Sequence, residues 1–116
     1  MIKIDIMEGA SYNNLDALKK VWHHSWKLQK VEINWNLRYD TVDAKNSETW
    51  PFKALFSEGQ DEIVVRIYSL AAGYGGSSPH DLMSILNWLG VKYYEKDILT
   101  ERMLEEDGWI HLVYYI

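Results

Sequence analysis

The sequence predicts an α+β fold, in which two to three helices pack on a mostly antiparallel sheet of about five strands. Three observations support this prediction. Several segments alternate apolar and polar residues with a period of two, which is typical of half-buried strands. Other segments carry apolar residues at helical spacing. The 116 residues contain no linker-like stretch and 47% of them are hydrophobic, so one globular domain over residues 1–116 is expected.

The N-terminal part predicts a strand followed by a helix. Isoleucines alternate with charged residues over 2–7, which indicates a strand with one buried face. Asn13 or Asn14 is a suitable N-cap for a helix that should run to about Leu28. The expected apolar stripe of that helix consists of Leu15, Leu18, Trp22 and Trp26.

The middle of the chain predicts three strands. The strongest signal covers residues 31–39, where apolar and polar side chains alternate without interruption. Two further β-prone runs, 50–56 and 63–68, flank a short loop that contains glycine, and together they predict a hairpin. Pro51 cannot donate a hydrogen bond to a neighbouring strand, so it should lie at the start or edge of its own. The second run is apolar on both faces and is expected in the centre of the sheet.

The C-terminal part predicts two helices and two strands. Ser78 followed by Pro79 is a typical helix start, with Asp81 returning the capping hydrogen bond, and Gly90 should end this helix in the left-handed conformation. The remaining expected elements are a short strand over 91–94, a short acidic helix from Asp97 or Thr100 to Gly108, and a strand over 109–116. The predicted order is therefore β-α-β-β-β-α-β-α-β.

The composition argues against several classes of protein. The chain has no cysteine, which excludes disulfides and thiolate metal sites. Its net charge of −5 argues against direct nucleic-acid binding, which depends on clustered lysines and arginines. The N-terminus does not resemble a signal peptide, and no apolar run approaches the length of a membrane span. A cytoplasmic protein of a bacterial cell or a phage-infected host cell is expected.

A glycine-rich segment lies between a predicted strand and a predicted helix, where backbone amides and the helix dipole can bind an anion. A P-loop would carry a lysine after its second spaced glycine, and this chain has Ser-Ser-Pro-His there. This segment supports the alternative hypothesis of a small-molecule or nucleotide-binding protein or a small enzyme. Its ligand-binding residues would be Gly73, Tyr74, Gly75, Gly76, Ser77, Ser78 and His80.

No pattern in the sequence identifies a reaction or a metal site. His23 and His24 are adjacent, so they point in different directions on a helix or strand and one metal ion cannot readily take both. The serines near His80 lack the Gly-x-Ser-x-Gly motif and an orienting acid. We therefore expect a protein that is not an enzyme, with no catalytic residue, no metal and no cofactor.

Acidic residues flanked by aromatic residues form the main candidate binding surface. The leading hypothesis is a non-enzymatic protein–protein interaction module, a small acidic inhibitor or immunity-type protein of phage or mobile-element origin that blocks a partner with a basic surface. Because six Trp and eight Tyr are also suited to interfaces, a homodimer is a further hypothesis. The expected partner-binding residues are Tyr93, Tyr94, Glu95, Asp97, Glu101, Glu105, Glu106, Asp107 and Trp109.

Overall fold

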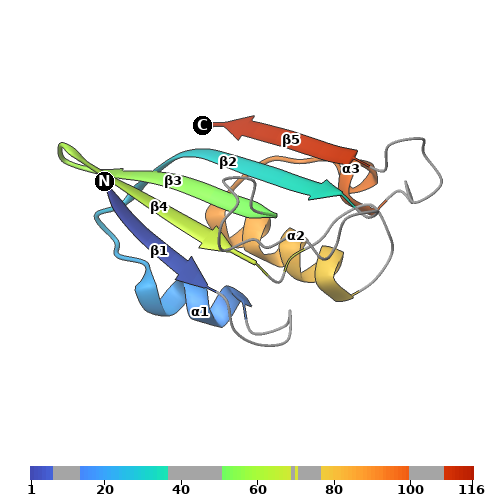
Figure 1. Cartoon of the computed structure of the whole chain (residues 1–116), viewed down its shortest axis with the longest axis horizontal. Coiled ribbons are helices and arrows are strands. Elements are labelled where there is room, and N and C mark those ends of the chain that lie inside the picture. The colour runs from blue at the N-terminus through green and yellow to red at the C-terminus, as the bar shows by residue number, and fades with distance from the viewer. Residues whose placement is uncertain (7–13, 37–50, 69, 71–76, 100–108) are drawn as a thin grey trace.

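A mixed sheet with helices on one side makes up the described part of the chain (Figure 1). The computed structural model describes residues 1–6, 14–36, 51–68, 70, 77–99 and 109–116. Within these ranges the predicted α+β class is confirmed, and no helix is long and apolar enough to cross a membrane. The strands are β1 (Ile2–Ile6), β2 (Lys27–Asn36), β3 (Phe52–Glu58), β4 (Asp61–Ile67) and β5 (Trp109–Tyr115). The helices are α1 (Asn14–Val21), α2 (Ser77–Leu89) and α3 (Glu95–Leu99).

The strands lie in the order β1-β4-β3-β2-β5. Three of the four pairings are antiparallel, as predicted for most of the sheet, whereas β1 runs parallel to β4. The predicted hairpin is β3 and β4, and the chain turns between them at Gly59 and Gln60. Gly59 has a φ of 60°, the left-handed conformation that tight hairpin turns of this length need. β4 lies inside the sheet, between β1 and β3, as its apolar sequence predicted.

Alternation of side chains along the strands decides which face of the sheet is buried. Phe52, Ala54 and Phe56 of β3 are buried, while Lys53 and Leu55 between them lie on the opposite face. The three described helices cover the first of these faces (Figure 1). Their fully buried contributions to the core are Leu18, Leu82, Ile85, Leu86 and Ile98. The opposite face carries no described helix, and we call it the open face.

A bulge in β2 changes the face on which its side chains lie. Gln29 is an extra residue between Leu28, which pairs with Phe56, and Lys30, which pairs with Leu55. Residues two apart in a regular strand share a face. Because of the bulge, Leu28 instead lies on the helical side and Lys30 on the open face.

The first helix is shorter than the sequence predicted. α1 ends at Val21 and not at about Leu28, and β2 begins at Lys27. The prediction was wrong because the apolar spacing continues from the helix into the turn that follows it. The N–H of Trp26 donates to the carbonyl of His23 at 2.9 Å in that turn. Beyond it, pairing with β3 satisfies the backbone that a longer helix would have used.

The second half of the chain departs from the prediction in three places. Residues 91–94 form no strand, because the N–H of Val91 donates to the carbonyl of Leu86 at 2.9 Å as part of the cap that ends α2. α2 begins at Ser77, one residue before the predicted cap Ser78. α3 begins at Glu95, before either predicted start. The order of described elements is therefore β-α-β-β-β-α-α-β.

Two other predicted elements extend beyond what the structure describes. The strand predicted over 31–39 is confirmed to Asn36 as part of β2, and residues 37–39 lie outside the described ranges. The predicted end of the acidic helix at Gly108 also lies outside them. The final strand is confirmed as β5.

Gly90 provides a direct test of the cap that ends α2. Its φ is 77°, and its N–H donates to the carbonyl of Asn87 at 3.1 Å. An added Cβ would meet nothing within 4 Å, so the cost of Gly90→Ala comes from the backbone conformation alone. We expect a loss of about 1 kcal/mol in the free energy of unfolding, measured by urea denaturation. Gly90→Asn is the matched control and should lose less, since asparagine tolerates this conformation better. Equal stability of the alanine variant and the parent would contradict this account.

Candidate functional site

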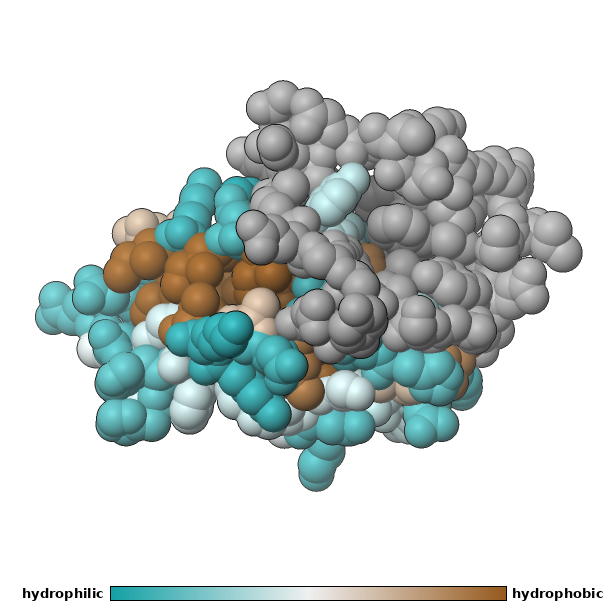
Figure 2. All heavy atoms as spheres, turned by 90° about the horizontal axis from the view of Figure 1, so that it is seen from below, coloured by the Kyte–Doolittle hydropathy of each residue, from teal (hydrophilic) through white to brown (hydrophobic). Residues whose placement is uncertain are grey.

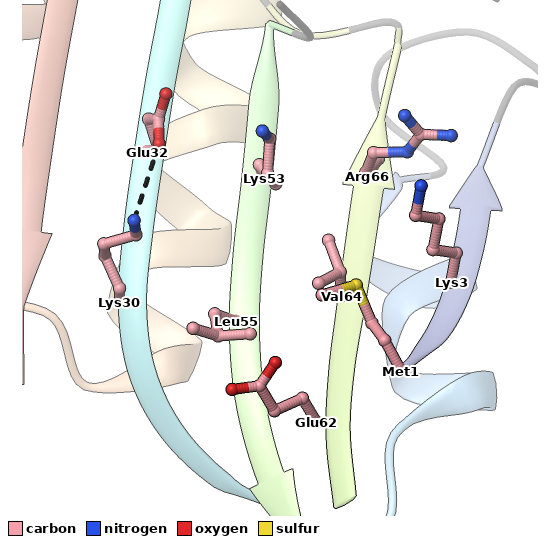
Figure 3. Close-up of a pocket in the computed structure, with 9 residues that line it drawn as sticks. All are labelled: Met1, Lys3, Lys30, Glu32, Lys53, Leu55, Glu62, Val64 and Arg66. Carbon is pink, nitrogen blue, oxygen red and sulfur yellow. Dashed lines mark ion pairs between the residues drawn. The ribbon is translucent and has the colours of Figure 1, made fainter. Parts of the chain in front are cut away.

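The open face of the sheet holds a basin of about 300 Å³ (Figure 3). We call this hollow the sheet basin. Four of its lining side chains are cationic and two are carboxylates, although the whole chain has a net charge of −5. The lining residues are Met1, Lys3, Lys30, Glu32, Lys53, Leu55, Glu62, Val64 and Arg66.

An apolar floor runs across the middle of the sheet basin. Leu55 of β3 pairs with Val64 of β4, and Val64 is only 8% exposed. Lys30 of β2 pairs with Leu55 on one side, and Lys3 of β1 pairs with Val64 on the other. Across the sheet, the pairing register therefore places a lysine on each side of the apolar floor.

The next row of paired residues is charged throughout. Glu32, Lys53, Arg66 and Asp5 follow one another across β2, β3, β4 and β1. Arg66 donates from Nε and Nη2 to the two carboxylate oxygens of Asp5, both at 2.7 Å. Such a two-point ion pair fixes the guanidinium plane. The amine of Lys53 lies between Glu32 and Arg66 in Figure 3 and makes no ion pair within the described residues.

Glu32 is held in its ionised form by several neighbours. The side-chain amide of Asn34 donates to its carboxylate at 2.9 Å. Lys30 Nζ lies 3.8 Å and His111 Nε2 lies 3.7 Å from its oxygens. The hydrogen bond from Asn34, with the charges of Lys53, Lys30 and His111, keeps the pKa of Glu32 below its ordinary value although burial acts in the opposite direction. At neutral pH this carboxylate marks one limit of the basin's positive charge.

A second concave surface lies on the helical side of the sheet and is lined by aromatic residues. The turn after α1, the C-terminal end of α2 and the adjoining parts of β2 and β3 provide its side chains. We call this surface the tryptophan groove, and its volume is about 350 Å³. Seen from below in Figure 2, the molecule also exposes a group of hydrophobic residues on the left, among charged and polar ones. Its lining residues are Trp22, Trp26, Leu28, Phe56, Trp88 and Leu89.

Aromatic contacts give the tryptophan groove its shape. The indoles of Trp22 and Trp88 meet edge to face, with ring centres 5.4 Å apart and planes at 77°. The ring of Trp26 lies 5.2 Å from that of Phe56, which joins the groove to the core. Lys19 Nζ lies 5.9 Å from the centre of the Trp88 ring, within the range of a cation–π contact. Trp22 remains 36% exposed, so part of this residue is accessible at the surface.

No local pattern in the sequence predicts this groove. Trp22 was expected in the core with Leu18, and Leu18 is indeed fully buried. Because α1 ends at Val21, Trp22 follows the helix, and its indole contacts that of Trp88 edge to face. The alternation of lysines with apolar residues in the strands could have indicated the charged face of the sheet. That alternation does not reveal the pairing register, which places Lys3, Lys30 and Lys53 on the same face of the sheet.

The alternative ligand site around the glycine-rich segment stays a prediction. Gly73, Tyr74, Gly75 and Gly76 lie outside the described residues, and Ser77 and Ser78 are described only as the first turn of α2. His80 is exposed on α2. The carboxylate of Asp81 accepts a hydrogen bond from the side-chain amide of Asn14 at 3.3 Å, which ties α2 to α1.

The histidine pair lies in the exposed turn after α1. The rings of His23 and His24 stack with centres 4.4 Å apart. His23 Nδ1 lies 2.6 Å from the hydroxyl of Ser25, and this hydroxyl donates to the carboxylate of Glu58. A catalytic triad has its histidine between the serine and the acid, whereas here the serine lies in the middle. In the described part of the chain, no group of three or more potential metal ligands comes together.

The predicted acidic and aromatic surface is described in part. Tyr94 is 71% exposed, and Glu95 is exposed beside it at the start of α3. Asp97 is half-buried, and Tyr93 donates its hydroxyl proton to Asn87 Oδ1 at 3.1 Å. Trp109 begins β5, and only its backbone is described. The other predicted members, Glu101, Glu105, Glu106 and Asp107, lie outside the described residues.

Comparisons with known proteins add no family or function. No protein-family model, no curated protein and no solved structure matches this chain.

Asp81 makes the stability of the fold depend on pH. Burial raises the pKa of Asp81, and the charge of Asp16 acts in the same direction, while the hydrogen bond from Asn14 opposes both. A raised pKa means that the folded chain binds this proton more tightly than the unfolded chain. The contribution of Asp81 to stability is therefore fully present below the ordinary value of 3.8 and is lost as the pH rises through the folded-state pKa.

We expect Asp81→Asn to raise the urea midpoint at neutral pH, because the buried charge is removed while a polar group stays beside Asn14. The gain should shrink as the pH is lowered towards 3.8. Asp61→Asn, at an exposed position in the β3–β4 hairpin, is the control and should change the midpoint little. A lower midpoint for Asp81→Asn at neutral pH would show that the charged hydrogen bond from Asn14 outweighs the cost of burial.

Proposed function

We propose that this chain is a non-enzymatic protein–protein interaction module that blocks a partner by surface binding, as inhibitors and immunity-type proteins do. The tryptophan groove is the observation that carries the proposal. It combines three indole rings with apolar neighbours in a concave surface, and Trp22 is 36% exposed there. Exposed apolar patches of this kind mark binding sites, and tryptophan is among the residues that contribute most to interface energy.

The groove fits an apolar side chain of a partner better than a polar one. Its lining residues are all aromatic or aliphatic, and the Trp22–Trp88 and Trp26–Phe56 ring contacts lie within it. Trp22 and Trp88 already contact each other in the free chain, so little rearrangement is needed before an anchor residue enters. We propose that one buried apolar anchor of the partner supplies most of the binding energy.

Charge selects the partner that reaches the groove. The net charge of −5 steers the chain towards a basic protein over a distance of about one Debye length, roughly 8–10 Å. The exposed Glu95 and the acidic residues that follow α3 in the sequence supply part of this charge. We therefore propose a partner with a basic surface, met in the cytoplasm, where a chain without cysteine gives up nothing by lacking disulfides.

The groove is tested with a partner identified by affinity capture from the native host. Trp22→Ala should weaken the purified complex by about 30-fold in Kd, the loss typical of a truncated hot-spot residue. Tyr115→Ala is the matched control, because Tyr115 is an exposed aromatic residue at 79% on a different element, and its Kd should stay unchanged. Circular dichroism and urea midpoints show whether both variants keep the fold. An unchanged Kd for both Trp22→Ala and Trp88→Ala would overturn the proposed docking surface.

Electrostatic steering is tested separately by reversing charge in the acidic segment. The triple variant Glu101→Lys, Glu105→Lys, Glu106→Lys should slow association with the same partner at low salt and leave the dissociation rate nearly unchanged. Raising the salt concentration should bring the association rates of parent and variant together, since salt screens exposed charges. Stopped-flow measurements provide both rates. Identical association rates at low salt would contradict the steering by this segment.

A further inference from the structure

The sheet basin and the tryptophan groove lie on opposite faces of the sheet, so the basin needs a separate explanation. We propose that the sheet basin is a binding site for a small organic anion with an apolar body, of which a medium-chain carboxylate is the simplest example. This inference is independent of the protein-binding function proposed for the groove. Three features support it: the apolar floor, the arrangement of the cations and the size of the hollow.

The floor suits a hydrocarbon segment. Leu55 and Val64 are cross-strand partners, and they lie on the face of the sheet that no described helix covers. Figure 3 shows the side chain of Met1 beside that of Val64, which widens the apolar area. Val64 is already buried, whereas Leu55 is half-buried and Met1 is exposed, so an apolar ligand would gain about 25 cal/mol for each Å² of these two side chains that it removes from water.

The cations suit an anionic group at one end of this floor. Figure 3 shows the amines of Lys53 and Lys3 and the guanidinium of Arg66 at the same end of the basin, beyond Val64. The carboxylate of Glu62 lies at the other end. A bound carboxylate would therefore take one orientation, with its charge towards the lysines and its chain over Leu55.

The charges are not fully balanced within the basin. The carboxylate of Asp5 forms an ion pair with Arg66, and Lys30 Nζ lies 3.8 Å from a carboxylate oxygen of Glu32. Lys3 and Lys53 form no ion pair with any described residue. An anion placed between their amines would gain two charge contacts without breaking an existing pair.

The size of the hollow favours a small molecule over a macromolecule. Its volume of about 300 Å³ matches the lower end of ligand pockets. An acidic peptide of a partner would be expected to need a longer continuous surface, and here Glu62 and Glu32 limit the positive area on two sides. Binding of an acidic peptide is therefore treated as a competing outcome of the test.

Three ligands of equal chain length isolate the contribution of charge. Octanoate, octanol and octylammonium are titrated into ¹⁵N-labelled protein up to about 10 mM, a range suited to millimolar Kd values. Octanoate should give saturable shifts of the backbone amides around Leu55 and Val64. Octanol should bind at least tenfold more weakly, and octylammonium should give no saturable shift at these amides.

Variants then locate the anion. The pair Lys3→Gln and Lys53→Gln should together weaken octanoate binding at least tenfold, whereas the exposed Lys20→Gln on α1 should leave it unchanged. The amide spectrum shows whether each variant is folded. Lys53→Arg keeps the charge and should bind octanoate as the parent does, and this comparison remains valid if the doubly substituted chain is unstable.

Each of four results would overturn the proposal. The first three are that octylammonium shifts the amides of the basin as strongly as octanoate, that the octanoate shifts centre on Trp22 and Trp88, and that no ligand of the series saturates. The fourth is that a glutamate-rich peptide shifts the amides of Leu55 and Val64 at lower concentration than octanoate, which would make the basin a docking surface for a partner chain.

Discussion

The double pairing of β3 constrains the rest of the molecule. β3 pairs with β2 on one side and with β4 on the other, and every second side chain points to the helices. Phe52, Ala54 and Phe56 must be buried there, so the register cannot shift by one residue without exposing them. The same register places Lys53 and Leu55 on the open face. The hydrophobic core thus determines which charged side chains meet on the surface that it does not contact.

Neighbouring residues therefore serve different surfaces. Phe56 lines the tryptophan groove, and Leu55, the residue before it, lines the sheet basin. The helices cover one face only in the described part of the chain, which leaves the other face available for charged side chains. Arg66 and Asp5 show how such a face stays ordered, because their two hydrogen bonds link β4 to β1 across the parallel pairing.

Much of the fold followed from local patterns in the sequence. Alternation of apolar and polar residues identified the strands, and Gly90 and Gly59 occupy left-handed positions that other residues adopt only at a cost. The end of α1 at Val21 could not be predicted, because Trp22 continues the helical spacing beyond it. The decisive contact, edge to face with Trp88, joins positions that are far apart in the sequence.

Long-range pairing also explains why the candidate sites were missed. Lys3 and Lys53 belong to strands that lie far apart in the sequence, β1 and β3, and β4 lies between these strands in the sheet. No local pattern in the sequence states that β1 pairs in parallel with β4. The predicted acidic surface, by contrast, came from a continuous run of residues, and its described members Tyr94 and Glu95 are exposed.

The bulge at Gln29 shifts the alternation of side-chain directions along β2 by one residue. The side-chain amide of Gln29 donates a hydrogen bond to Ser57 Oγ at 2.9 Å. The backbone carbonyl of Gln29 accepts a hydrogen bond from the N–H of Ile116 at 3.0 Å, so the extra residue is tied to both neighbouring strands. A strand of strict periodicity would have had to aim Leu28 and Lys30 in the same direction. One inserted residue thus lets a single strand furnish an apolar side chain to one face of the sheet and a cation to the other.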